Sequence, residues 1–239
     1  MNQENELYDK IFAFNLACQV NETMRENDLT PDEDAFMNIC IVSEHAASAV
    51  RTIFQMHQYK QDHHTGVLTR ITLKADATLR EGPGWMKEQF WTLTEGARDS
   101  VPTLPETEDT TTKMPGLYVV PRPALLHAYI RALGLFRDYD GLVELVQWMV
   151  KHRHELTKRR KMDRRGRVLM RRALIALRVF VEDRWEPSRS ELEDEEVTVT
   201  ASAEQVEEIR ELVESVNHWG GWPSVEEVEM YVEYGRGGD

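Results

Sequence analysis

The sequence predicts an all-α fold, built as an array of antiparallel helical hairpins of the α-solenoid type with an irregular insertion and loops. Two observations support this prediction. Apolar residues recur at intervals of three and four along most of the 239 residues, whereas the alternation typical of strands is scarce. The helical stretches are separated by short turns, so consecutive helices run antiparallel and bury their apolar faces against each other.

The first predicted helix carries apolar residues in two sets. Each set recurs at helical spacing: Leu7, Ile11, Phe14 and Cys18 in one, and Phe12, Leu16 and Val20 in the other, which Met24 extends. Residues 27–32 form a turn, with Pro31 near the start of the next helix. A second helix is predicted from Phe36, and a separate third helix from Ala49 to Met56.

The following region is less regular. Residues 67–79 fit either a helix or a strand, because threonines alternate with apolar residues there. Gly82-Pro83-Gly84 is a clear interruption, and an aromatic-rich helix follows from Trp85 to Leu93. Residues 99–115 contain three prolines and five threonines with almost no large apolar residue, which predicts an exposed or disordered loop.

The best-defined hairpin follows Pro121 and Pro123, and a strongly basic helix continues from it. Near the end of the chain Val206, Ile209, Val213 and Val216 mark one helical face. The WGGWP sequence from Trp219 to Pro223 ends that helix, and Ser224 with Glu227 is a capping-box signature for a last helix. The chain therefore divides into five segments: an N-terminal helical region (1–98), a flexible loop (99–116), the hairpin with the basic helix (117–185), an acidic spacer (186–202) and a C-terminal helical cap (203–239).

Charge is strongly segregated along the chain. The formal net charge is −13, yet eleven of the twenty-two residues from Lys151 to Arg172 are Lys or Arg, with only Glu155 and Asp163 as acids. A dense basic surface requires a polyanion or an acidic protein face to neutralise it. Residues 182–233 hold seventeen acids and three arginines, so this C-terminal region is itself a candidate to cover the basic helix.

The stretch from Tyr118 to about Thr157 resembles a pentatricopeptide repeat. Pro121-Arg122 lies at the place of the Pro-Asp pair that opens the repeat, and Asp140 at the acid that opens its second helix; the buried anchors correspond to Leu133, Leu145 and Met149. A second match begins at Pro31-Asp32, and the hairpin is also similar to helical-repeat proteins of fungal organellar gene expression.

The resemblance implies a function in RNA binding. Repeats of this family bind single-stranded RNA one base per repeat, and the base-reading places of the hairpin fall on Arg122 and His127. The basic stretch supplies further predicted contacts to phosphate: Arg159, Arg160, Lys161, Arg164, Arg165, Arg167 and Arg171. We therefore expect a non-catalytic adaptor associated with RNA or ribonucleoprotein, in mitochondrial gene expression.

Other functions remain open at this point. The main alternative is a protein-interaction scaffold without direct RNA contact, in which the basic helix pairs with acids of the same chain or of a partner. A nuclear import signal at residues 158–165 is a third reading, with the nucleus as the alternative location. Cys18 and Cys40 are expected as buried free thiols in a reducing, intracellular compartment, and no import signal is visible.

Catalysis finds little support in the sequence. It contains no GxSxG, HExxH or P-loop motif, and no GxGxxG after a strand, so we expect no enzyme and no cofactor. His63, His64, His152 and His154 match no zinc-binding spacing, which predicts no metal site. No apolar run approaches the roughly 18 residues of a membrane span.

Overall fold

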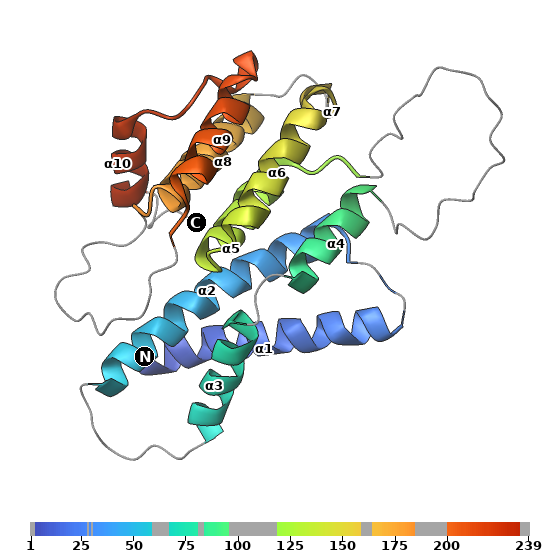
Figure 1. Cartoon of the computed structure of the whole chain (residues 1–239). Helices are drawn as coiled ribbons and strands as arrows, with labels where there is room; N and C mark the ends of the chain where they lie inside the picture. The colour runs from blue at the N-terminus through green and yellow to red at the C-terminus, as the bar shows by residue number, and fades with distance from the viewer. Residues whose placement is uncertain are drawn as a thin grey trace.

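The structure is a computed structural model that describes residues 3–27, 29, 31–58, 67–80, 84–95, 119–158, 164–184 and 200–234. Within these ranges the regular elements are all helices, which confirms the predicted all-α class (Figure 1). None of the described helices combines the length and apolar content that crossing a bilayer requires. The loop at 99–116 lies outside the described residues, as does most of the acidic spacer at 186–202.

In the described residues of the N-terminal half the helices are α1 (Gln3–Glu26), α2 (Glu33–Gln58), α3 (Val67–Arg80) and α4 (Gly84–Glu95). The C-terminal half contains α5 (Pro123–Leu135), α6 (Tyr139–Lys151), α7 (Arg153–Lys158), α8 (Arg164–Val181), α9 (Ala203–Glu214), the short 3₁₀ helix η2 (Asn217–Trp219) and α10 (Val225–Tyr234).

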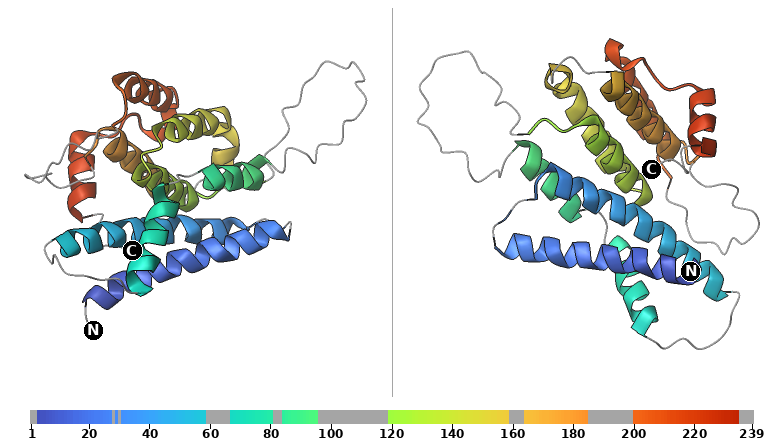
Figure 2. Two further views of the ribbon diagram at one scale, coloured as in Figure 1. Left: turned by 60° about the horizontal axis from the view of Figure 1, so that its bottom comes forward. Right: turned by 180° about the vertical axis from the view of Figure 1, so that it is seen from behind.

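Contacts between helices run in order across the molecule. α1 packs on α2 and α3, α2 packs on α5, and α5 packs on α8. α8 also packs on α10. α6 packs on α5 and on α9. Figures 1 and 2 show α1 at one edge of the molecule and α10 at the opposite edge. The described helices thus pack in two branches from α5, one through α8 to α10 and the other through α6 to α9.

The buried apolar side chains form two clusters. The larger cluster joins α2, α4, α5, α6, α8, α9 and α10, and its centre includes stacked rings of Phe90 and Tyr129, 4.6 Å apart, with Phe36 and Trp148 at their edges. The smaller cluster lies between α1, α2 and α3 around Ile11. α2 takes part in both clusters, so it connects the two halves of the fold.

Local signals explain where several helices begin. Asp138 caps α6, because its carboxylate accepts a hydrogen bond from the backbone N–H of Gly141 at 2.9 Å. Ser224 and Glu227 form the predicted capping box of α10. Ser202 and Gln205 form another capping box at the start of α9, which the sequence analysis did not identify.

The structure corrects two expectations about the helices and decides one that was open. The second and third predicted helices are one continuous helix, α2, because residues 33–58 contain neither proline nor glycine and the Ser43 hydroxyl bonds to the carbonyl of Ile39 inside the helix. Residues 67–80, which fitted a helix or a strand, form α3. The basic stretch is divided between α7 and α8, and residues 159–163 between them lie outside the described part of the chain.

Candidate functional site

The predicted polyanion contacts of the basic stretch fall into three groups. Arg159, Arg160 and Lys161 lie outside the described residues. Arg164, Arg165 and Arg167 lie in the first turn of α8, and all three side chains are exposed. Arg171 lies one to two turns further along the same helix, where it is half-buried.

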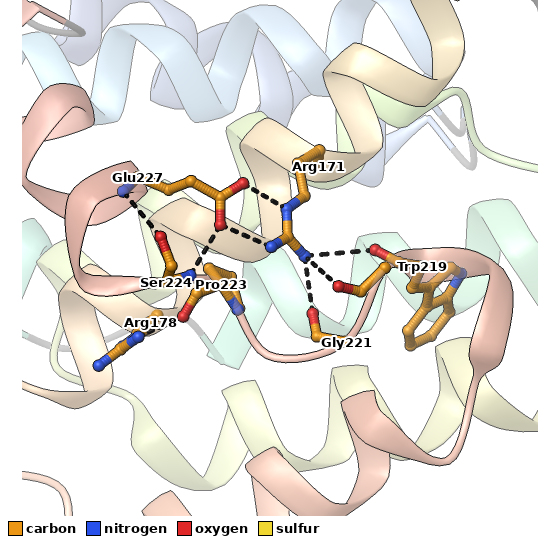
Figure 3. Close-up of polar contacts among 8 residues, drawn as sticks. Arg171, Arg178, Trp219, Gly221, Pro223, Ser224 and Glu227 are labelled. Carbon is orange, nitrogen blue, oxygen red and sulfur yellow. Dashed lines mark hydrogen bonds and ion pairs between the residues drawn. The ribbon is translucent and has the colours of Figure 1, made fainter.

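Arg171 binds the C-terminal part of the chain (Figure 3). Its guanidinium donates two parallel hydrogen bonds to the carboxylate of Glu227, from Nε to Oε1 at 2.8 Å and from Nη2 to Oε2 at 2.6 Å. Its Nη1 also approaches the carbonyl oxygens of Trp219, Gly220 and Gly221, at 3.3, 3.3 and 2.7 Å. A bidentate arginine–carboxylate pair is among the stronger polar contacts in proteins. The charge of Arg171 is therefore neutralised by a carboxylate of the same chain.

The backbone of the WGGWP turn makes this contact possible. Gly220 and Gly221 both have positive φ angles, of 79° and 70°, a conformation that other residues adopt at a cost. The turn brings three successive carbonyl oxygens around one guanidinium. Glu227 is held in turn by the capping box, because its Oε2 accepts the backbone N–H of Ser224 at 2.7 Å. Arg171 is the main cause that lowers the pKa of Glu227 below its ordinary value.

Two further arginines of α8 contact the same C-terminal region. The guanidinium of Arg172 lies 5.8 Å from the ring centre of Tyr231. Arg178 donates to the carbonyl oxygen of Pro223, pairs with Glu182 at 2.7 Å, and lies 5.8 Å from the ring of Trp222. The arginines of α8 beyond its first turn, Arg171, Arg172 and Arg178, therefore contact residues 219–231 of the same chain.

Arg122, one of the two predicted base-reading residues, joins α5 to α2. Its backbone N–H donates to Glu33 at 2.5 Å, and its guanidinium pairs with the carboxylates of Glu33 and Asp34. These acids occupy the first turn of α2, where the helix dipole also favours negative charge. The side chain is thus engaged in holding two helix starts together.

His127, the other predicted base-reading residue, is a core residue with 8% of its surface exposed. Its Nε2 lies 2.9 Å from the hydroxyl of Tyr231, so it links α5 to α10. Burial, with smaller contributions from Arg131 and Arg172, lowers the pKa of His127 to about 3. The imidazole is therefore neutral at physiological pH and does not face solvent.

The predicted site does not come together as one surface. Arg122, His127 and Arg171 bind other residues of the same chain, and Arg164, Arg165 and Arg167 are exposed at the start of α8. The capping-box signature at Ser224 and Glu227 was visible in the sequence, but nothing in it places that box beside Arg171.

The outer face of α1 is the main feature that charge-based reasoning missed. Phe12, Leu16 and Val20 are 60%, 50% and 51% exposed, although they recur at helical spacing. The other apolar set of α1, from Leu7 to Cys18, packs against α2 and α3. Both sets were apparent in the sequence, and only the structure distinguishes the covered one from the uncovered one.

The remaining chemical groups give no metal-binding arrangement among the described residues. No group of three or more His, Cys, Asp or Glu side chains in this part of the chain is suited to hold a metal ion. Cys18 and Cys40 are free thiols. Burial raises the pKa of Cys18 to about 11 and that of Cys40 further, so neither is activated as a nucleophile.

Comparisons with known proteins add no assignment. No protein-family model, curated protein or solved structure matches this chain.

Proposed function

We propose that this protein is a non-catalytic helical adaptor that holds another protein on its surface. The observation that carries the proposal is the distribution of apolar residues on α1, which lie on two opposite faces of one helix. A helix that is apolar on both faces is normally covered on both. Here α2 and α3 cover one face, and the other exposes a line of three large apolar side chains.

The arginines of α8 also favour this function over RNA binding. The case for RNA depended on a continuous basic ridge that is open to solvent. Arg171, one of the predicted phosphate contacts, instead binds the carboxylate of Glu227 and the carbonyl groups of residues 219–221. An arginine that is already neutralised by a bidentate carboxylate has little to gain from a phosphate.

The architecture proposed for the adaptor is an array of helical hairpins, with α5 and α6 as the unit that resembles a pentatricopeptide repeat. The order of contacts supports it, since α2, α5 and α8 pack consecutively and α6 packs on α9. In such arrays each unit contacts mainly its neighbours, and the extended surface serves to bind partners.

The test is affinity capture of the tagged chain from extracts of its source organism, with and without nuclease treatment, followed by mass spectrometry. The proposal expects the same partners to be retained at unchanged amounts after digestion of all RNA and DNA. Loss of every partner on nuclease treatment would overturn it and favour the second candidate.

The second candidate is RNA contact, in organellar gene expression, through the first turn of α8. The observation that favours it is the exposure of Arg164, Arg165 and Arg167 at a helix N-terminus, where the helix dipole disfavours cations. An external phosphate would relieve this unfavourable arrangement. The location proposed with this candidate is the mitochondrion, and the nucleus is the alternative.

A salt series with labelled single-stranded RNA tests the second candidate. A plot of log affinity against log salt concentration has a negative slope, and removing three phosphate contacts should make that slope shallower by about 2. The triple variant R164E/R165E/R167E should show this loss, whereas R70E/K74E/R184E, which makes the same charge change at exposed residues elsewhere, should retain the slope. Equal effects of the two variants would show attraction by net charge alone and reject this site.

A further inference from the structure

We infer that the outer face of α1 binds a basic amphipathic helix of the partner protein, an inference that rests on the proposed adaptor function. The face consists of Phe12, Leu16 and Val20 (the α1 stripe), which follow each other at intervals of four residues. Residues at this interval lie on one side of a helix, and the stripe extends over about 12 Å of its length. Such a line of apolar anchors matches a partner helix with the same periodicity.

The position of α1 leaves room for a partner helix. α1 lies at the side of the molecule away from α8 and α10, with α3 beside it, and packs on α2 and α3 by its other face (Figures 1 and 2). Leu29, directly after α1, is also 59% exposed. Among the described residues, no helix packs against the outer face of α1.

The charges around the stripe decide what kind of helix binds there. By sequence α1 carries two basic residues, Lys10 and Arg25, and five acids: Glu4, Glu6, Asp9, Glu22 and Glu26. Lys10 already pairs with Glu6 at 3.2 Å. By helical periodicity Asp9 continues the stripe towards the N-terminus, whereas Glu6 and Glu26 lie on its two sides. The face is apolar in the middle and acidic around it, which is complementary to apolar anchors flanked by Lys or Arg.

A second copy of this chain is a poorer occupant for two reasons. An antiparallel α1 pair centred on Leu16 brings Glu6 of one copy near Glu26 of the other, and a parallel pair brings Asp9 against its own equivalent, so like charges meet in both arrangements. The three half-exposed side chains offer on the order of 300 Å². Permanent homodimers bury roughly 1,000 Å² or more per partner, so this area suits a single docked helix better than a permanent dimer.

The experiment uses the full chain and a synthetic peptide as the probe. The peptide is a fluorescein-labelled amphipathic helix with Leu at i, i+3, i+4 and i+7 and Lys at the other positions; a control peptide has Glu in place of Lys. Fluorescence anisotropy should show saturable binding of the Lys peptide and at least tenfold weaker binding of the Glu peptide, because the Glu peptide meets like charges on α1.

Two variants with the same charge change locate the binding site. Leu16→Glu should weaken binding of the Lys peptide at least tenfold, although its added negative charge by itself attracts that peptide. Val168→Glu, at a residue that is 59% exposed on α8, should change the affinity less than twofold. Equal affinities of the two variants would show that net charge alone drives binding and would overturn the inference, provided that circular dichroism confirms both variants as folded.

Two further results separate this inference from the function on which it depends. A dimer seen by sedimentation that dissociates in the L16E variant would make a second copy the occupant and overturn the inference. If L16E retains the nuclease-resistant partners of the wild-type chain, the adaptor function stands and the assignment of its site to α1 fails.

Discussion

The α-carbon of Gly134 in α5 faces the ring of Phe180 in α8 so closely that a methyl group on residue 134 would lie 2.5 Å from both Cδ atoms of the ring. Carbon atoms that are not bonded pack at about 3.5 to 4.0 Å. A side chain at position 134 therefore requires the ring or one of the helices to move. Both residues are buried, and α5 and α8 are packed against each other along their length.

We expect Gly134→Ala to destabilise the protein by about 1 to 3 kcal/mol through overpacking, although alanine has the higher helix propensity. Urea unfolding followed by circular dichroism measures the change. In the G134A background, Phe180→Leu should recover part of the loss, because the smaller side chain makes room for the methyl group. A G134A protein as stable as the wild type would show that α5 and α8 adjust without cost.

The Arg171–Glu227 pair should stabilise the docking of α10 on α8. Replacing either partner by Gln is expected to cost about 1 to 3 kcal/mol, with R171Q the more severe because it also releases three backbone carbonyls. The double variant should show positive coupling rather than additive loss. Hydrogen exchange should become faster in α10 before it changes in α5.

An exposed pair provides the control for this prediction. Arg210 and Glu207 lie 2.9 Å apart on α9, with side chains 38% and 56% exposed. Exposed ion pairs contribute little, so R210Q/E207Q should alter stability by less than about 1 kcal/mol. Equal losses from the two pairs would mean that the Arg171 contact is no more than a surface ion pair.

His127 should make the protein less stable as the pH falls below neutral. Its pKa is about 3 in the folded chain and about 6.5 in the unfolded chain, so between these values only the unfolded chain binds the proton. The contribution of neutral His127 is fully present above pH 6.5 and declines as the pH falls, by up to about 1.4 kcal/mol per pH unit.

The measurement is the free energy of unfolding of wild type and His127→Gln at pH 7 and pH 5.5. The variant should lose less stability over this interval, because Gln does not titrate. Burial also lowers the pKa of His152 and His218, so some dependence on pH should remain. If the free energy of unfolding changes equally with pH in both proteins, His127 titrates alike in the folded and unfolded chains and is not buried.

The buried pair of Arg131 and Glu44 joins α5 to α2 and offers a further test. Their side chains are 8% and 16% exposed. Removing one charge leaves the other buried without its main partner, so Arg131→Met should cost about 3 to 5 kcal/mol. The double variant R131M/E44L should be more stable than R131M alone. A double variant that is worse than R131M would show that Glu44 depends mainly on other contacts.

Much of the helical structure was predictable because its signals are local. Pro123 marks the start of α5, the Ser224–Glu227 box marks the start of α10, and the two glycines of the WGGWP turn mark a chain reversal. The false break within α2 has the same origin, because small and polar residues around Ser43 and Ser48 weaken the apolar pattern without ending the helix. Packing of the adjoining residues Ala46, Ala49 and Val50 keeps it continuous.

The candidate site was less predictable, because the contacts that decide it join distant parts of the chain. Arg122 bonds to a residue 89 positions away, Arg171 to one 56 positions away and His127 to one 104 positions away. Nothing local to an arginine shows whether its guanidinium meets water or a carboxylate.

Residues within a few turns of one another are enough to predict that the chain is helical, where most helices begin, and that α1 is apolar on two sides. Which apolar side of α1 is covered, and which arginines of α8 are exposed, depends instead on contacts between distant segments. Exposure depends on which helices pack against each other. That packing brings Arg171 to Glu227 and His127 to Tyr231, and neither the periodicity of apolar residues nor a count of charges predicts such pairs.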